Sequence, residues 1–279
     1  MVCRTRGFLP HTFFQMSALF ILLFPAPMHG EAAFDLHAFK ERMERGDLAR
    51  LDEQALRTLL AESPPSALID GALLILEAHP QYEAVLSKRE RVRGVLAPEP
   101  DVIKLKFQRK PMAVYGEWIQ GPHKGRRVLY NSAVNPKEIV VREGGWLGLI
   151  SVHIDLDNPI TMRDTNHRIT EMGIEYVLRK TAKDLSVLVS RGGTIDVSNG
   201  RWFKEHGVRY FEIINRTDGP PDYYAHWARL KFNLETGLLE EVEIRDQAGN
   251  MLELLSYRDI RWATFPPDTF DEHNPDYGF

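Results

Sequence analysis

The sequence is poor in the residues that sulfur chemistry requires. Its 279 residues include one cysteine, Cys3, so no disulfide can form within the chain and no cluster of thiolates can hold a metal ion. It also lacks an excess of basic residues, because 39 acidic side chains outnumber 35 basic ones and give a formal net charge of -4. Proteins that bind nucleic acid usually present a basic face, so no nucleic-acid partner is expected.

Two common catalytic signatures are also missing. The glycine-rich run from Gly144 to Gly148 does not end in Gly-Lys-Ser/Thr, and so it does not match a phosphate-binding loop. No His-Glu-x-x-His pair marks a zinc site. The glycine-rich run carries Trp146, and it predicts either a tight turn packed on the core or an apolar loop beside a hydrophobic opening.

Residues 1–32 have the pattern of an export signal. Two arginines near the start precede an apolar core at residues 16–24, and small residues suited to cleavage follow it. The core is too short to span a bilayer comfortably and is followed by prolines, so a cleaved signal peptide is favoured over a membrane anchor. The mature protein is therefore expected in the periplasm.

Two helical regions are predicted. Residues 33–80 form an N-terminal helical segment, in which Pro64 and Pro65 separate an amphipathic first part from an apolar helix at 67–78. Another helix at about 170–190 is inserted among later strands, and its apolar positions recur three and four residues apart. Both helices have apolar faces that need a covering layer, and the sheet is the expected partner.

The remainder of residues 81–279 consists of short strands joined by turns. Apolar and polar side chains alternate in 103–108 and again in 228–234, which is typical of strands with one buried face. Short connections favour antiparallel neighbours, since parallel strands need a crossover of a dozen or more residues. The charged residues of the first strand, including Lys88 and Glu90, are expected on a solvated face because charges are seldom buried.

These elements predict an α+β protein. Its centre is a curved, incompletely closed antiparallel β-sheet, a half-barrel, whose concave face is covered by the apolar helices. Such a sheet leaves an apolar cavity when the helices shift, and hydrophobic ligands need such a cavity. The candidates for lining it are Leu105, Phe107, Val114, Trp118, Tyr130, Trp146, Leu230 and Phe232.

One polar cluster could carry chemistry. It comprises His153, Asp155, Asp157, Arg163, Asp164 and His167. Histidine and aspartate side chains can bind zinc or a similar ion, and the first three would share one face of an extended run. No second motif supports a metal site, so a hydrogen-bonded loop without metal ligands or catalytic residues is favoured.

Five short motifs between about Tyr82 and the C-terminus carry a resemblance. They are Lys88-x-Glu90-Arg91-x-x-Gly94, Phe107-x-x-Lys110-Pro111, Gly121-Pro122-x-Lys124-Gly125-Arg126-x-Val128-Leu129-Tyr130, His167-x-Ile169-Thr170-x-x-Gly173-Ile174 and Asn274-Pro275-Asp276-Tyr277. Together they resemble a bacterial family catalogued as domain of unknown function 1571, although Arg168 stands where that family has proline. The family is in turn similar to the periplasmic lipoprotein-carrier (LolA-like) fold. The resemblance implies a curved antiparallel sheet with helices on its concave side, and it supplies no catalytic residues.

The favoured function is to bind or carry a lipid, a lipoprotein or another hydrophobic molecule in the periplasm, without enzymatic activity or a cofactor. The expected partner is a hydrophobic small molecule or a lipidated protein. Two alternatives stay open. One is a binding or sensing module that docks an envelope protein and carries nothing. The other is a metal-dependent hydrolase built on His153, Asp155, Asp164 and His167.

Overall fold

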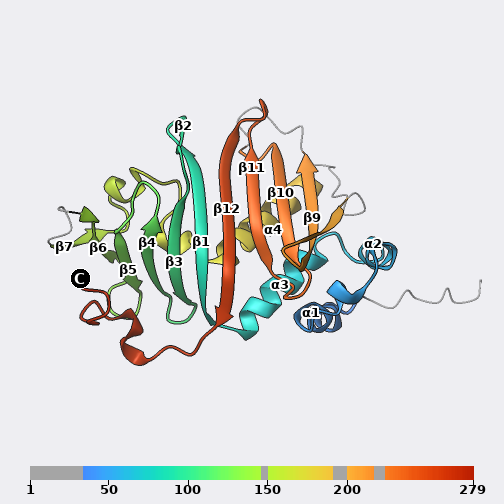
Figure 1. The fold of residues 1–279 in the computed structure, drawn as a ribbon, viewed down its shortest axis with the longest axis horizontal. Coiled ribbons are helices and arrows are strands. Elements are labelled where there is room, and N and C mark those ends of the chain that lie inside the picture. The colour runs from blue at the N-terminus through green and yellow to red at the C-terminus, as the bar shows by residue number, and fades with distance from the viewer. Residues whose placement is uncertain (1–33, 146–149, 191–199, 217–223) are drawn as a thin grey trace, which may run out of the picture. The chain divides into compact units, whose positions relative to one another are not determined.

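The chain contains four α-helices within the residues that the computed structural model describes, which are 34–145, 150–190, 200–216 and 224–279 (Figure 1). The predicted signal peptide lies outside these residues. The helices are α1 (Leu36–Glu44), α2 (Glu53–Ala61), α3 (Ala67–Ala78) and α4 (Ile174–Ser190). Helices α3 and α4 coincide with the two apolar helices expected from the sequence. None of the helices described is long and apolar enough to cross a bilayer.

The first two helices begin at aspartates that cap them. The carboxylate of Asp35 accepts the backbone N–H of Ala38 at 3.0 Å, and that of Asp52 accepts the N–H of Ala55 at 2.8 Å. These bonds satisfy donors that the first turn of a helix leaves free. The positions of α1 and α2 are therefore set by local sequence as well as by packing.

In the part of the chain that the structure describes, twelve strands form one antiparallel sheet. Their order is β7-β6-β5-β4-β3-β1-β12-β11-β10-β9-β8, and β2 pairs with β1 beside this path. The strands are β1 (Gln81–Val92), β2 (Val95–Leu96), β3 (Asp101–Gln108), β4 (Ala113–Gln120), β5 (Arg127–Asn131), β6 (Glu138–Arg142), β7 (Ser151–Asp155), β8 (Arg201–Glu205), β9 (Val208–Arg216), β10 (Trp227–Asn233), β11 (Leu239–Arg245) and β12 (Met251–Trp262). No pairing joins β7 to β8 among the described residues, so the sheet stays open.

Helices α3 and α4 lie across one face of this curved sheet (Figure 1). The start of α4 is fixed there by Tyr82 of β1, whose hydroxyl accepts the backbone N–H of Ile174 at 2.9 Å. Tyr257 of β12 donates to the carbonyl of Met172 at 3.0 Å. One large apolar core joins the helices to the inward side chains of the sheet. The predicted fold class, a curved half-barrel with helices on its concave face, is confirmed.

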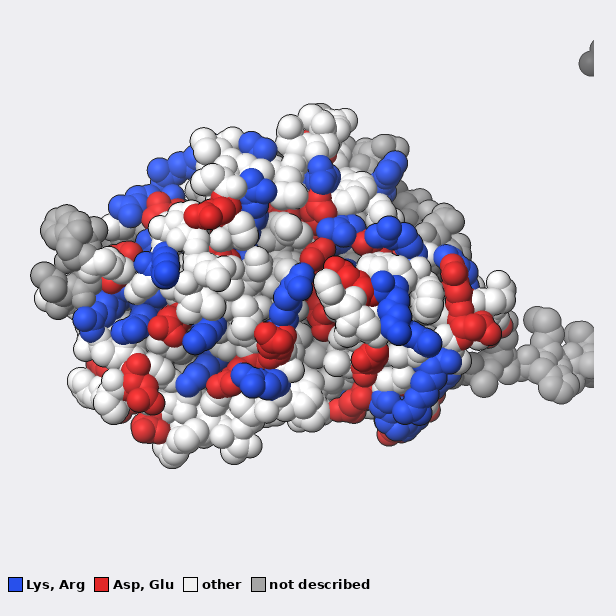
Figure 2. Space-filling model, viewed as in Figure 1, with Lys and Arg blue, Asp and Glu red and all other residues white. Residues whose placement is uncertain are grey.

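The opposite, outer face is rich in charge, and acidic and basic side chains are interspersed over it (Figure 2). On β10, Arg229 lies 3.0 Å from Glu212 and 2.7 Å from both Glu241 and Glu243. These partners come from β9 and β11, so the arginine ties three strands together. Alternation of charged and apolar side chains thus continues across the sheet, with the charges outward.

Residues 263–279, here called the C-terminal cover, pack on an apolar part of the outer face. Tyr277 stacks on Tyr115 of β4 with 3.9 Å between the ring centroids. Its hydroxyl donates to the carbonyl of Thr269 at 2.7 Å, and the side chain of Asn131 donates to the carbonyl of Phe270 at 3.0 Å. A second, smaller core therefore lies outside the half-barrel.

Two charged residues of β1 contradict the expectation of a solvated face. Lys88 and Glu90 are both only 5% exposed. They share the parity of Tyr82, Ala84 and Leu86, which point into the core. The strand keeps its alternation to its end, so the prediction was wrong about the side on which these charges lie.

Candidate functional site

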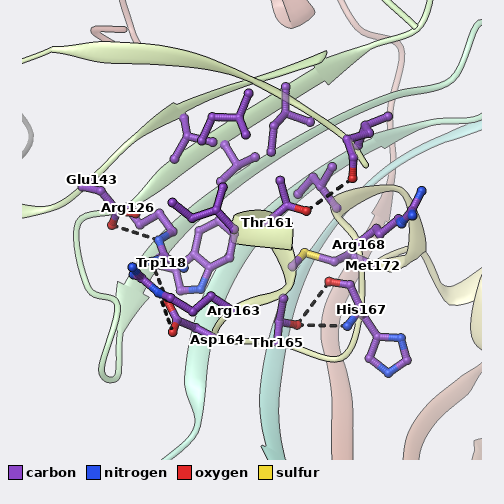
Figure 3. A pocket seen from close by; sticks show the side chains of 17 residues that line it. Trp118, Arg126, Glu143, Thr161, Arg163, Asp164, Thr165, His167, Arg168 and Met172 are labelled. Carbon is purple, nitrogen blue, oxygen red and sulfur yellow. Dashed lines mark hydrogen bonds and ion pairs between the residues drawn. The ribbon is translucent and has the colours of Figure 1, made fainter. Parts of the chain in front are cut away.

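A pocket opens between strands β4–β7 and the segment from Leu156 to Met172, here called the roof segment (Figure 3). The cavity has a volume of about 120 Å³, and the space around it opens to solvent. The apolar lining residues are Trp118, Val128, Ile139, Val141, Ile154, Leu156, Ile160, Ile169 and Met172.

Strand register builds the wall of the pocket. Val128 of β5 lies opposite Val141 of β6, and Ile139 of β6 lies opposite Ile154 of β7. Residues opposite each other in an antiparallel pair point to the same side of the sheet. Four aliphatic side chains from three strands therefore form one continuous apolar surface.

Trp118 closes the wall on β4. Gly116, two residues earlier on the same side of the strand, leaves space for the indole, because a Cβ at this glycine would lie 3.1 Å from the ring. The guanidinium of Arg126 lies over the indole at 5.9 Å from its centroid. The indole ring of Trp118 thus faces the pocket, and the guanidinium of Arg126 lies over it beside the entrance.

The roof segment is held by turns and short 3₁₀ helices at Pro159–Met162 and Ile169–Glu171. The side chain of Asn158 accepts the backbone N–H of Ile160 at 3.0 Å and starts the first of them. Ile160 is 51% exposed although it lines the pocket. An apolar side chain at this position marks the rim, where a ligand would cover it.

Charged residues surround the mouth. The carboxylate of Asp164 accepts hydrogen bonds from Arg163, at 3.1 Å from Nη2, and lies 3.5 Å from Arg126. The hydrogen bond from Arg163 is the main reason that the pKa of Asp164 is lowered. Arg126 also pairs with Glu143 at 3.0 Å. The entrance is therefore polar and the interior apolar, an arrangement suited to a molecule with one apolar end.

The predicted cavity residues fall into three groups. Trp118 lines the pocket, and Leu230 lines a smaller space between α4 and strands β9–β11. Trp146 lies outside the described residues. The others are buried in the core rather than around the pocket: Leu105, Phe107, Val114, Tyr130 and Phe232. Their contact with a ligand stays a prediction.

The predicted polar cluster does not form one site. His153 lies 3.0 Å from Glu272, and Asp157 lies 2.9 Å from Arg168. Asp155 accepts the backbone N–H of Asp157 at 2.7 Å and so stabilises a turn. Arg163 and Asp164 pair at the pocket mouth, as described above. The residues required for the hydrolase alternative are thus divided among separate ion pairs and turns.

His167 belongs instead to a buried group of charges at the inner end of the roof segment. Its Nε2 lies 2.6 Å from Glu253 of β12 and 3.8 Å from Glu90 of β1. Its ring points away from Trp118 (Figure 3). Burial lowers the pKa of His167, but the carboxylates of Glu171, Glu253 and Glu90 outweigh burial and raise it to about 9.

Most of the residues around the pocket and around His167 were not predicted from the sequence. The wall residues Val128, Val141 and Ile154 looked like ordinary strand positions, and nothing in their spacing reveals the roof segment that faces them. Glu90 could have been found from its parity with Tyr82 on β1. Glu253 gives no local signal, because its role depends on pairing with a strand more than a hundred residues away.

The family described as "Protein of unknown function (DUF1571)" matches residues 79–279. The chain belongs to this family. The matched part includes the whole sheet, the roof segment, α4 and the C-terminal cover. The resemblance found from the five motifs is confirmed. No curated protein matches the chain.

Three solved structures resemble the chain weakly, with TM-scores below 0.5. A LolA superfamily protein of Nitrosomonas europaea is 9% identical, covers 75% of this chain and 97% of its own, and has a TM-score of 0.29. A putative outer membrane lipoprotein-sorting protein domain of Vibrio parahaemolyticus is 12% identical, with 73% and 97% covered and a TM-score of 0.32. Lipoprotein LppX of Mycobacterium tuberculosis is 11% identical, with 72% and 97% covered and a TM-score of 0.41. With so little identity, function is argued from the pocket itself.

Proposed function

We propose that the protein binds the apolar part of a lipid, a lipidated protein or a similar hydrophobic molecule in the pocket beneath the roof segment. The observation that carries this proposal is the continuous aliphatic wall of β5–β7, closed by Trp118 and opening at a charged mouth. Ligand sites of this kind are lined mainly by apolar side chains and have few polar groups to orient the ligand. Binding rather than catalysis is proposed because the lining is mainly apolar.

The apolar interior supplies the affinity. Each buried CH₂ of a ligand contributes roughly 0.8 kcal/mol through removal of apolar surface from water. Arg126 and Arg163 are held in ion pairs at the mouth, so the charged groups stay at the hydrated entrance and outside the apolar interior. An acyl chain can therefore enter while its polar end stays with Arg126 and Asp164.

Substitution at the rim tests the proposal. We expect Ile160→Asp to weaken binding of a fluorescent fatty-acid probe by roughly tenfold or more, because an aliphatic contact worth about 1.5–3 kcal/mol is replaced by a charge. Val134→Asp is the matched control, since Val134 is also exposed and aliphatic but does not line the pocket. Probe affinity that is equal in the wild type and both variants would refute binding in this pocket.

The cellular location is part of the proposal. A periplasmic carrier must be exported, and the pattern of residues 1–32 is that of a cleaved signal peptide. N-terminal sequencing of protein from the periplasmic fraction should find a start between Gly30 and Phe34. Mass spectrometry of an organic extract of the same material would identify the bound molecule. An intact Met1 on membrane-associated protein would contradict export with cleavage.

Docking of an envelope protein is the second candidate function. Strand β7 lies at the end of the described sheet, and its Val152 is 41% exposed. An edge strand with apolar side chains can pair with a strand of a partner. Val152→Lys should weaken such an interaction. Because Val152 lies opposite Val141 of the pocket wall, loss of probe binding without loss of partner binding would favour the carrier function.

A further inference from the structure

Three side chains from distant parts of the chain meet in an arrangement that can hold a cation. Glu90 of β1, His167 of the roof segment and Glu253 of β12 each offer one ligand atom, and these atoms lie within 4.8 Å of one another. We propose that they bind one divalent transition-metal ion, with zinc as the best match. The proposal is independent of the hydrophobic ligand, because the imidazole ring points away from Trp118 (Figure 3).

The pairing of β1 with β12 brings two glutamate carboxylates together, and their negative charges favour a cation between them. Glu90 and Glu253 are direct partners across β1 and β12. Like charges directly opposite each other destabilise a strand pair, and both carboxylates are buried, Glu253 being 2% exposed. Buried carboxylates must be paired with cations or coordinate a metal. On this otherwise largely apolar face, two buried carboxylates therefore lie side by side.

The imidazole is oriented as a metal ligand. Its Nε2 faces Glu253 at 2.6 Å and Glu90 at 3.8 Å, while its Nδ1 faces Glu171 at 3.4 Å. A metal-binding histidine commonly has a carboxylate behind its second nitrogen. Nε2 and Oε1 of Glu253 form an ion pair at 2.6 Å, although neither atom has an aligned hydrogen-bond partner. Two potential ligand atoms thus face each other directly.

The other carboxylate oxygens are already held. Oε2 of Glu90 lies 2.7 Å from Lys88 and accepts the hydroxyl of Thr165 at 2.9 Å. Oε2 of Glu253 accepts the hydroxyl of Tyr224 at 3.3 Å. These contacts fix both carboxylates. Oε1 of Glu253 faces His167, and Oε1 of Glu90 lies 3.8 Å from the imidazole and also accepts the backbone N–H of Asn166 at 3.1 Å. Groups that orient metal ligands in this way commonly surround metal sites.

Charge balance favours a doubly charged ion. The carboxylates of Glu90, Glu253 and Glu171 contribute three negative charges, and Lys88 contributes one positive charge. With neutral imidazole the group carries -3 + 1 = -2, which a divalent cation neutralises and a single proton does not. One nitrogen and two oxygens suit zinc, and imidazole disfavours magnesium and calcium, which prefer oxygen. The ion would also fasten the roof segment to β1 and β12.

Zinc titration of the wild-type protein tests the site. Protein treated with a chelator should take up one equivalent of zinc in calorimetry, release protons and melt at a higher temperature, while magnesium should leave the melting temperature unchanged. Absence of zinc uptake would overturn the proposal and would mean that a proton on His167 alone links the two glutamates.

Variants locate the bound ion. We expect His167→Gln to abolish uptake at this site, and Glu171→Gln to weaken it by roughly 10–100-fold, since it keeps the three ligands and removes only the carboxylate behind Nδ1. Glu171 is partly exposed, so this variant should fold even if His167→Gln does not. His153→Gln is the control, because His153 lies at the surface near Glu272 and Glu138. Zinc binding that is lost in the control and kept in the other two variants would show a surface ion and refute the buried site.

Discussion

A single hydroxyl, that of Tyr82, links the sheet to the helix that covers it. The ring is buried, lies 5.1 Å from that of Phe107, and its oxygen accepts the first backbone N–H of α4 at Ile174. Burial raises the pKa of this phenol far above its usual value, so the hydroxyl stays neutral at neutral pH. The hydroxyl satisfies the first backbone N–H of α4, which is buried and so cannot bond to water instead.

Removing this hydroxyl should therefore be costly. We expect Tyr82→Phe to lower the free energy of unfolding by about 1–3 kcal/mol, because the buried N–H of Ile174 loses its acceptor. Urea denaturation measures the difference. Tyr130→Phe is the comparison, since its hydroxyl makes only a 3.4 Å contact with the carbonyl of Pro136. Equal losses in the two variants would contradict the role assigned to Tyr82.

Gly173 is the second residue on which the docking of α4 depends. A Cβ at this position would lie 2.6 Å from the ring of Phe107. We expect Gly173→Ala to destabilise the protein by about 1–3 kcal/mol through overpacking. Adding Phe107→Leu should recover part of the loss, and a double-mutant cycle measures this coupling. Strict additivity of the two substitutions would show that the close approach has no energetic effect.

Neighbouring strands β3 and β4 carry aromatic side chains with different surroundings. Phe107 is enclosed by Tyr82 and the start of α4, whereas Trp118 borders the pocket. We expect Phe107→Ala to cost about 3–5 kcal/mol, as for a filled core. Trp118→Ala should cost less, because a pocket wall lacks packing partners on one side, and it should lose probe binding.

Thermal melting and probe titration of the same two variants separate these effects. Phe107→Ala should keep probe affinity as long as the protein is folded at the temperature of the titration. The assignment of these residues would be wrong if both variants lost equal stability and neither changed the affinity for the probe.

The C-terminal cover behaves as an element in its own right, because it packs on the outer face of β4 and β5. We expect Tyr277→Ala to lower the free energy of unfolding by about 3 kcal/mol, as for loss of a buried aromatic ring. Tyr277→Phe keeps the stack on Tyr115 and removes the bond to Thr269, so a loss of about 1 kcal/mol is expected. Chemical denaturation of both would show whether the ring or the hydroxyl matters; similar losses would exclude stacking as the main contribution.

At the scale of the whole molecule, the periodicity of apolar residues in the sequence was sufficient to predict the fold class. Alternation in β3 and β10 and the apolar faces of α3 and α4 follow from sequence periods of two and 3.6. The pocket could not be derived in the same way. It depends on the placement of the roof segment over β4–β7, which is set by contacts between residues far apart in sequence. The burial of Lys88 and Glu90 could not be predicted either, because a buried charge is recognised only when its partner is known.

The pairing of β12 with β1 affects how the chain folds. Leu86 pairs with Tyr257, so the seam at the middle of the sheet closes a loop of 257 - 86 = 171 residues. Contacts between such distant residues slow folding, since the entropy of loop closure is lost before the contacts form. Until β12 arrives, β1 keeps an open edge toward that side, and open edges invite aggregation. A chain that ended before Met251 would therefore lack the seam and leave its two half-sheets unjoined.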